Sequence, residues 1–279
     1  MQVLLERNKI LKYKINKRIF MDRLFLNRIS LKEDIAPQLF DSFPLNISAL
    51  KMFVFIKITK PVTIFYGENG CGKSTLIEAI ADKLGMPTSG GNKNMGAFVQ
   101  TNLVKGNENA PLSEYLILSK SYLRPTNMYF FRAESFHEIS ALIDEDAKRH
   151  GRYKYLNSEN YSSKDLLCQS HGESFIDLIE HQFREGGLYI LDEPESALSP
   201  SNQLRLLKLI HNLSKEGSQF IIATHSPILL GYKNAVIVNL DDGMKFIDYK
   251  DTKIYKLYSS FMEDNIKFQN NLFSDDDYY

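Results

Sequence analysis

The chain has 279 residues, of which 43% are hydrophobic and 24% are charged, and its 34 basic side chains equal its 34 acidic ones. This composition is typical of a globular protein with a buried core, and a net charge of zero excludes a surface that is basic all over. Two cysteines that lie far apart in the sequence, Cys71 and Cys168, do not make a disulfide framework. No apolar run reaches 18 residues, so we expect a cytoplasmic protein without membrane insertion.

The first predicted elements of the chain are strands. β-branched and aromatic runs predict strands at 24–31, 52–58 and 62–66. Apolar residues at helical spacing then predict a helix over 74–84 that ends at Gly85. The polar stretch over 86–111 is rich in Gly and Asn, which predicts a long mobile loop.

Helices and strands alternate through the rest of the chain. Helices are predicted over 112–122, 135–148, 173–184 and 201–215, and residues 149–169 are expected to be weakly structured. Strands are predicted at 127–132, 187–191 and 219–224, followed by a hairpin of 235–240 with 244–249 and by two short helices. This alternation predicts an α/β fold with a mostly parallel sheet covered by helices.

A phosphate-binding loop lies between the strand at 62–66 and the helix at 74–84. Residues 67–74 read Gly-Glu-Asn-Gly-Cys-Gly-Lys-Ser, where glycines allow the backbone to curl closely around phosphates. Lys73 is expected to reach the β- and γ-phosphates, and Ser74 to offer its hydroxyl to Mg²⁺. The helix that follows points its partial positive charge at the same phosphates. The predicted nucleotide-binding residues are Gly67, Glu68, Asn69, Gly70, Cys71, Gly72, Lys73, Ser74 and Thr75.

Polar side chains follow two later buried strands. Asp192 and Glu193 come directly after an apolar run, and His225 follows the strand at 219–224. Because parallel strands bring their carboxyl ends to one edge of a sheet, we expect the three side chains to lie close together. Asp192 is placed to hold Mg²⁺, and Glu193 to orient and deprotonate an attacking water. A histidine at a strand end is by itself more often structural.

The stretch Gln169–Ser174 reads as the beginning of a helix. Ser170 can cap that helix, Gly172 lets another backbone approach, and Glu173 lies in the first turn. Taken alone, these residues indicate no more than a capped helix.

Together these motifs resemble those of the ABC-type ATPases. Residues 67–74 resemble their Walker A motif, 170–174 their signature motif, 188–193 their Walker B motif with its catalytic glutamate, and 196–199 their D-loop, with His225 as the switch histidine. The order agrees as well, with 99 positions from Lys73 to Gly172, 20 more to Asp192 and 33 more to His225. Three further stretches, at 131–136, 169–175 and 219–230, resemble a group of small bacterial stand-alone ATPases that lack a membrane domain.

The resemblance implies a P-loop fold with an N-terminal antiparallel β portion and a helical subdomain at about 100–185. It implies ATP and Mg²⁺ as cofactors, with Lys73, Glu193 and His225 in catalysis and Ser74 and Asp192 at the metal. It also implies an ATP-dependent homodimer, in which one subunit's phosphate loop faces the other subunit's signature residues, here Ser170, His171, Gly172 and Glu173. Residues 21–279 would form this domain.

Two features depart from the family pattern. The signature motif has Glu173 and Ser174 where a glycine and a glutamine are usual, and no clear glutamine loop follows a strand. Gln100 and Glu134 are both candidates for that glutamine position.

Basic residues are concentrated at the N-terminus, where residues 1–32 contain nine Lys or Arg against two acidic residues. They indicate either a contact with an anionic surface such as nucleic acid or, more commonly for a charged run, a solvated extension. We predict that residues 1–20 are such an extension.

Three functions follow from these observations. The leading one is an ATP-hydrolysing dimeric switch that acts on a client protein or nucleic acid that the sequence does not identify. The second is the nucleotide-binding subunit of a membrane transporter. The third, a module that binds ATP without hydrolysing it, is disfavoured by the presence of Glu193 and His225.

Overall fold

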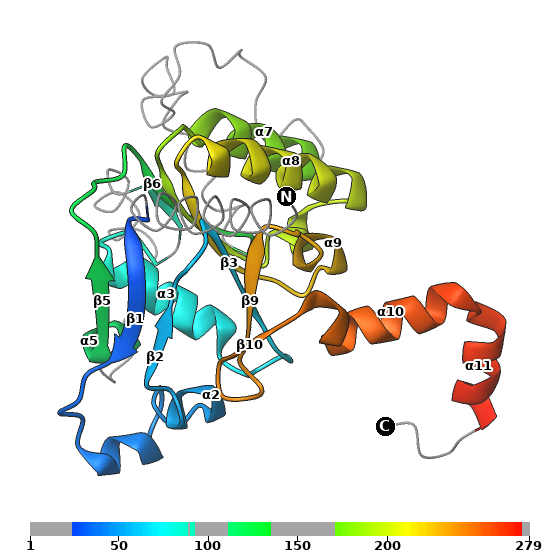
Figure 1. The fold of residues 1–279 in the computed structure, drawn as a ribbon, viewed down its shortest axis with the longest axis horizontal. Coiled ribbons are helices and arrows are strands. Elements are labelled where there is room, and N and C mark those ends of the chain that lie inside the picture. The colour runs from blue at the N-terminus through cyan, green and yellow to red at the C-terminus, as the bar shows by residue number, and fades with distance from the viewer. Residues whose placement is uncertain (1–23, 89, 93–110, 135–170, 275–279) are drawn as a thin grey trace, which may run out of the picture.

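The computed structural model describes residues 24–88, 90–92, 111–134 and 171–274, and their arrangement is shown in Figure 1. A seven-stranded sheet has the order β10-β9-β3-β8-β7-β6-β4, and a three-stranded sheet has the order β2-β1-β5. The strands of the large sheet are β3 (Val62–Tyr66), β4 (Gly91–Asn92), β6 (Met128–Arg132), β7 (Leu188–Asp192), β8 (Gln219–Ala223), β9 (Ala235–Asn239) and β10 (Lys245–Ile247). Those of the small sheet are β1 (Leu26–Leu31), β2 (Phe55–Lys57) and β5 (Leu116–Lys120).

Five neighbouring strands of the large sheet are parallel, and antiparallel strands close both of its edges. Strands β9, β3, β8, β7 and β6 run in one direction, whereas β10 pairs antiparallel with β9 and β4 antiparallel with β6. All residues of β3, β7 and β8 are buried, as expected for parallel strands that are covered on both faces. The expected α/β fold, with a mostly parallel sheet and an N-terminal antiparallel portion, is confirmed.

Helices cover both faces of this sheet. The longer ones are α3 (Lys73–Lys83), α7 (His171–Gln182), α8 (Pro200–Lys215), α10 (Lys253–Glu263) and α11 (Asn265–Ser274). Short helical segments are η1 (Pro37–Asp41), α2 (Ser48–Lys51), α5 (Leu112–Tyr115), η4 (Pro194–Ala197), α9 (Pro227–Leu230) and η5 (Tyr249–Asp251). In the described part of the chain, every helix is too short or too polar to span a bilayer.

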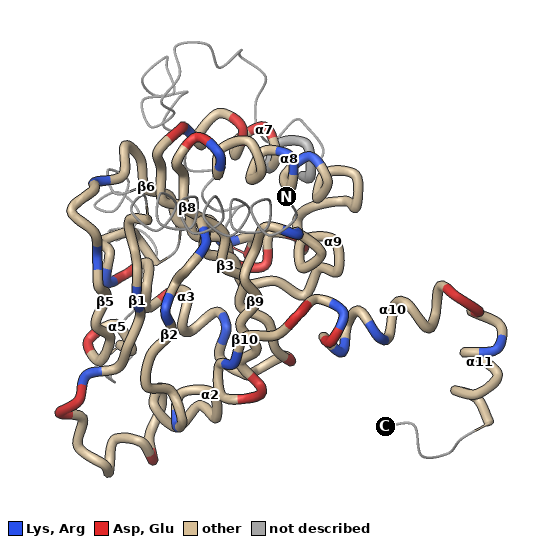
Figure 2. Tube along the Cα trace, in the orientation of Figure 1, with Lys and Arg blue, Asp and Glu red and all other residues tan. Residues whose placement is uncertain are grey.

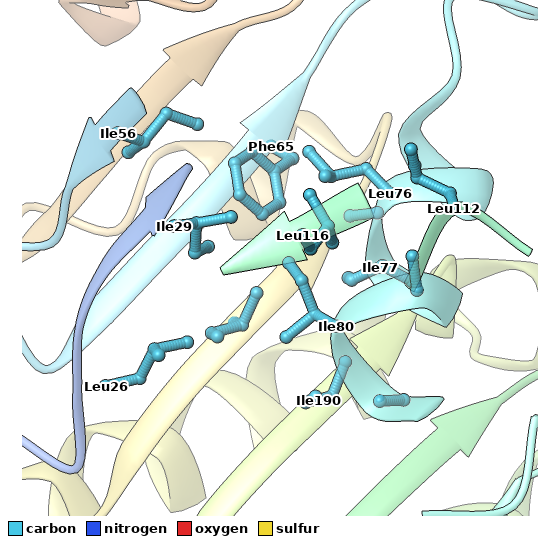
Figure 3. Packing of buried hydrophobic residues seen from close by; sticks show 14 of the residues in the cluster. Leu26, Ile29, Ile56, Phe65, Leu76, Ile77, Ile80, Leu112, Leu116 and Ile190 are labelled. Atoms are coloured by element: carbon cyan, nitrogen blue, oxygen red, sulfur yellow. The ribbon is translucent and has the colours of Figure 1, made fainter. Parts of the chain in front are cut away.

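Two apolar clusters follow from the alternation of side chains along the strands. Phe65 and Ile190 face α3 and the small sheet, and Figure 3 shows them packed with Leu76, Ile77 and other members of this first cluster. Their strand neighbours belong to the second cluster, which includes α7 and α8. The large sheet is therefore the middle layer, with α3 and the small sheet on one side and α7 and α8 on the other.

Most predicted elements are present in the structure, but the helix predicted over 112–122 is wrong. The helix ends at Tyr115, and Leu116–Lys120 form strand β5, which pairs antiparallel with β1. Side chains in β5 alternate: Leu116 is fully buried and Ile117 is 46% exposed. Burial of the side chains thus begins with the two-residue alternation of a strand, where the three-to-four-residue spacing of a helix was expected. The helix predicted over 135–148 lies outside the described residues, as does most of the predicted loop over 86–111.

A buried glutamine joins the two sheets. Oε1 of Gln219 on β8 accepts hydrogen bonds from the backbone N–H groups of Phe25 and Leu26, at 2.8 and 2.9 Å. Its Nε2 donates to the carbonyl oxygen of Leu26 at 2.8 Å. Since buried backbone groups need partners, this one side chain satisfies three groups at the beginning of β1.

We predict that Gln219→Leu lowers the free energy of unfolding by about 3 kcal/mol or more. Leucine fits the apolar surroundings but leaves three buried backbone groups unsatisfied, each of which costs about 1–3 kcal/mol. Urea unfolding of the variant checks this, with Gln38→Leu at an exposed position as the control. Equal stability of the wild type and Gln219→Leu would show that the link between the sheets contributes little.

The C-terminal helices extend away from the body of the molecule. Figure 1 shows α10 leaving the edge of the sheet beyond β10, and α11 turning back from its end. Phe261 of α10 and Phe268 of α11 meet edge to face with their ring centroids 5.6 Å apart. Charged residues of both signs are spread along the whole described trace in Figure 2, including these helices. The basic residues before position 24 lie outside the described part.

Candidate functional site

The phosphate-binding loop connects β3 to α3 in the predicted position. Gly72 precedes the first residue of α3 with a left-handed backbone, at φ 102°. A Cβ atom on Gly72 would lie 2.6 Å from Cγ2 of Ile47, so the segment that contains Ile47 packs directly on this turn. Both the conformation and the lack of space require glycine here. By contrast, a Cβ on Gly70 would meet no atom within 4 Å, so the outside of the loop is open.

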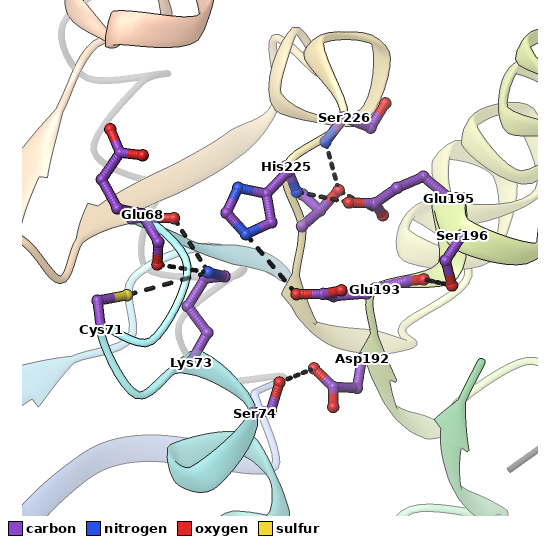
Figure 4. Close-up of polar contacts among 12 residues, drawn as sticks. Glu68, Cys71, Lys73, Ser74, Asp192, Glu193, Glu195, Ser196, His225 and Ser226 are labelled. Atoms are coloured by element: carbon purple, nitrogen blue, oxygen red, sulfur yellow. Dashed lines mark hydrogen bonds and ion pairs between the residues drawn. The ribbon is translucent and has the colours of Figure 1, made fainter. Parts of the chain in front are cut away.

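Lys73 lies inside this loop. Its side chain is 4% exposed, and Nζ donates to the carbonyl oxygens of Gly67 and Glu68, both at 3.0 Å (Figure 4). The loop is also held from outside, because the backbone N–H of Glu68 donates to both carboxylate oxygens of Asp241, at 3.1 and 3.0 Å. The structure therefore places the Lys73 amino group at the centre of a loop that Asp241 anchors from outside.

Ser74 and Asp192 meet where α3 begins and β7 ends. The hydroxyl of Ser74 donates to Oδ1 of Asp192 at 3.1 Å, as Figure 4 shows. Asp192 is 4% exposed, and burial raises its pKa to about 7, against the opposing effects of the Ser74 hydrogen bond and of Arg132. Two oxygen groups at such an edge suit Mg²⁺, which takes one or two protein oxygens and completes its shell with phosphates and water.

The described part of the chain contains no larger set of ligands beside this pair. Within the described ranges, no group of three or more His, Cys, Asp or Glu is arranged to hold a metal ion. A metal that depends on nucleotide phosphates for its remaining ligands fits this donor set better than a permanently bound one.

Glu193 directly follows Asp192 and has a different environment. Its backbone is left-handed with φ 44°, which is uncommon for a residue other than glycine, and its N–H donates to the carbonyl oxygen of Ala223 at 2.9 Å. The side chain is 39% exposed, and Oε1 lies 3.6 Å from Nε2 of His225. That nitrogen is buried without a hydrogen-bond partner among the described residues. The carboxylate and the imidazole thus lie together at one open edge, as predicted.

One residue that positions His225 was not predicted from the sequence. Oε1 of Glu195 accepts from the backbone N–H of His225 at 2.5 Å, and Oε2 accepts from the Thr224 hydroxyl at 2.7 Å. Ser226 is held similarly, since its hydroxyl donates to Oε1 of Gln203 on α8 at 2.6 Å. The segment after Glu193 therefore fixes the segment that carries His225. In the sequence, Glu195 is only an acidic residue two positions after Glu193.

Other predicted residues are placed only in part. His171, Gly172 and Glu173 form the first turn of α7, and Ser170 lies outside the described residues. Gln100 also lies outside them. Glu134, the other candidate for the glutamine position, comes two residues after β6, and its carboxylate accepts from Arg132 at 3.0 Å. The expected contact between residues 170–173 and a partner's nucleotide stays a prediction.

Two family models match parts of the chain. Residues 170–231 match the family described as "AAA domain, putative AbiEii toxin, Type IV TA system", and residues 40–135 match one described as "AAA domain". These ranges contain the phosphate-binding loop, the Asp192–Glu193 pair and His225.

Curated relatives include proteins named as ABC transporters. The chain is 30% identical over 176 residues to the ribose import ATP-binding protein RbsA of Clostridium tetani, a match that covers 59% of this chain and 34% of that protein. It is 23% identical over 171 residues to ABC transporter G family member 6 of Arabidopsis thaliana, covering 58% of this chain and 23% of that protein. The chain thus spans about a quarter to a third of the length of these relatives.

Solved structures with a similar fold are more distant. CbiO1 of Clostridium perfringens, part of an ABC transporter complex, aligns with a TM-score of 0.44 and 16% identity over 87% of this chain and 96% of that one. The SMC head domain of Thermotoga maritima aligns with a TM-score of 0.39 and 18% identity, over 77% and 95%. At these TM-scores the likeness is too distant to carry an assignment.

Proposed function

Since the chain belongs to the ABC-type ATPase superfamily, we propose that it binds ATP with Mg²⁺ at residues 67–75 and hydrolyses it as a dimeric switch. ATP hydrolysis is the general reaction of this superfamily. The observation that carries the proposal is the convergence of Lys73, Ser74, Asp192, Glu193 and His225 at the carboxyl edge of one parallel sheet.

Each of these side chains has a role that its surroundings support. Lys73 exchanges its two carbonyl partners for the β- and γ-phosphates. Ser74 and Asp192 would hold Mg²⁺, which would supply positive charge to these phosphates. Glu193 accepts a proton from the attacking water, because its carboxylate is accessible and directly follows the metal site. His225 donates from Nε2 to the γ-phosphate, which gives that buried nitrogen a partner.

Glu195 supports the proposed reaction indirectly. We predict that Glu195→Ala lowers kcat about tenfold and changes the affinity for ATP little, because the His225 backbone loses its acceptor while the phosphate-binding loop is untouched. Glu195→Gln keeps one acceptor oxygen and should be less affected. Phosphate release under steady-state conditions measures this, with the exposed Glu185→Ala as the control. Full activity of Glu195→Ala would remove Glu195 from this role.

The switch itself consists of two subunits that close on two nucleotides. In this arrangement Ser170, His171, Gly172 and Glu173 of one subunit face the nucleotide of the other. The γ-phosphate is the group that differs between the closed and open states, and its loss on hydrolysis lets the subunits part. The client, whether protein or nucleic acid, would respond to this change in a cytoplasmic setting.

Light scattering of Glu193→Gln with and without Mg²⁺-ATP tests the dimer. The variant is expected to bind ATP without consuming it, so its mass should double when the nucleotide is added. Ser170→Arg in the same background should stay monomeric while still binding ATP. An unchanged mass of Glu193→Gln at saturating ATP contradicts the switch.

A second candidate is the nucleotide-binding subunit of a membrane transporter. The curated relatives named as transporters favour it. The unusual residues Glu173 and Ser174 in the signature motif favour the switch instead. Co-purification of the protein with a polytopic membrane protein from its own cell would support the transporter, and its recovery with a water-soluble client would support the switch.

A further inference from the structure

An arginine lies against the proposed metal site, which is an unusual position for a positive charge. Arg132 is the last residue of β6, and the register of the sheet places it directly beside Asp192 of β7. Its Nε is 4.0 Å from Oδ2 of Asp192 and has no hydrogen-bond partner among the described residues. Oδ1 of the same carboxylate is already occupied by Ser74. The guanidinium therefore faces the oxygen of Asp192 that Ser74 does not contact.

Two further carboxylates hold the other end of this guanidinium. Its NH1 forms an ion pair with Glu78, which lies one helical turn after Ser74 on α3, and NH2 forms one with Glu134 at 3.0 Å. The Arg132 side chain is 25% exposed, so these charges are only partly screened by water. Three carboxylates thus converge on one positive charge, which is fixed in place by partners on α3 and after β6.

This arrangement has opposite consequences in the empty and the loaded site. Without nucleotide, a divalent ion that uses Oδ2 of Asp192 must lie beside the guanidinium and is repelled by it. With nucleotide, phosphate oxygens bring negative charge and additional ligands, which offset that repulsion. Without Arg132, the carboxylates of Asp192, Glu78 and Glu134 would lose their shared positive partner, and the negative charge near Asp192 would attract a divalent ion more strongly.

We propose that Arg132 is a positioning residue that keeps divalent ions out of the empty site and thereby makes metal binding depend on nucleotide. The inference rests on the proposed function, because it takes Ser74 and Asp192 as the metal edge of an ATP site. The described contacts of Arg132 are with Asp192, Glu78 and Glu134, and its charge should have a measurable effect on the protein without nucleotide.

The test is the binding of Mn²⁺ to the nucleotide-free protein, followed by the electron paramagnetic resonance of the free ion. Arg132→Gln removes the charge and should bind Mn²⁺ at least about tenfold more tightly than the wild type. Arg132→Lys keeps the charge and should bind as weakly as the wild type. A role for Arg132 that is limited to pairing with Glu78 and Glu134 predicts a gain in Mn²⁺ affinity that survives the additional change Asp192→Asn.

Two controls make the result specific. Arg205→Gln removes an arginine that pairs with Asp177 and Glu180 on α7, and it should leave Mn²⁺ binding unchanged. Adding Asp192→Asn to Arg132→Gln should abolish the gained affinity, which places the new metal at this edge. If Arg132→Gln does not fold, Arg132→Met supplies the same loss of charge with a similar length.

The outcomes separate this inference from the proposed function. Mn²⁺ affinity of Arg132→Gln that is equal to or weaker than that of the wild type overturns the inference, as does a gain that survives Asp192→Asn. Binding of a fluorescent ATP analogue by the wild type is measured independently. Failure of that binding overturns the proposed function, whatever the Mn²⁺ titration gives.

Discussion

Glu193→Gln is expected to lower the single-turnover rate of ATP hydrolysis by about 10²–10⁴-fold, the usual cost of removing a positioned general base. Glutamine keeps the size of the side chain but cannot accept the proton of the attacking water. The effect should be confined to chemistry, because the Glu193 carboxylate lies against His225 and, among the described residues, has no hydrogen bond or ion pair to the loop that holds Lys73. ATP should therefore stay bound while turnover stops.

Rapid quenching of protein mixed with radiolabelled ATP measures this rate. Glu216→Gln, at an exposed position after α8, is the matched control and should hydrolyse ATP as the wild type does. Glu134 is the alternative base, since it lies near the same edge with its side chain 77% exposed. A rate in Glu193→Gln close to that of the wild type, together with loss of activity in Glu134→Gln, would move the base to Glu134.

Lys73→Ala is expected to weaken ATP binding at least about tenfold and up to about a hundredfold. The change removes a charge-assisted contact with the phosphates, which is worth about 1.5–3 kcal/mol. The loop should keep its shape in the variant, because Asp241 holds it from outside through the Glu68 backbone. The loss therefore reports on the phosphate contact rather than on unfolding.

Calorimetric titration with ATP measures the affinity. Lys83→Ala, in the last turn of the same helix and exposed, is the control and should bind ATP as the wild type does. An affinity of Lys73→Ala equal to that of the wild type would falsify the assignment of residues 67–75 as the nucleotide site.

The main parts of the candidate site could be predicted from the sequence because each is a local pattern. The phosphate-binding loop is continuous along the chain, and Asp192, Glu193 and His225 each follow an apolar strand. One general rule, that parallel strands end at a common edge, is enough to bring them together. The structure places Asp192 beside Ser74, and Glu193 beside His225, at that edge.

The residues that support the site could not be predicted in this way. Arg132, Glu195 and Gln219 act on partners that depend on strand order and on the path of the chain after a strand ends. Arg132 meets Asp192 only because β6 and β7 are neighbours, although about 60 residues separate them in the sequence. A single buried or partly buried polar side chain gives no periodic signal. Arg132 and Gln219 lie in stretches that resemble the stand-alone ATPases, but that resemblance assigned them no role.

Strand β5 shows a different limit. Leu112, Leu116 and their neighbours fit helical spacing, and a short helix does form at Leu112–Tyr115. Pairing with β1 then favours an extended chain, because the exposed edge of that strand offers hydrogen bonds along its whole length. The local preference for a helix holds for one turn. Pairing with β1, about 85 residues earlier in the sequence, determines the extended conformation of residues 116–120.

The rate of phosphate release per subunit, measured across a range of protein concentrations, tests most directly whether this chain hydrolyses ATP as a closing dimer. Each active site needs residues from two subunits in this account. The rate per subunit should therefore rise with concentration and reach a plateau where light scattering shows the ATP-bound dimer. A rate per subunit that stays constant in samples that light scattering shows to be monomeric would contradict the account.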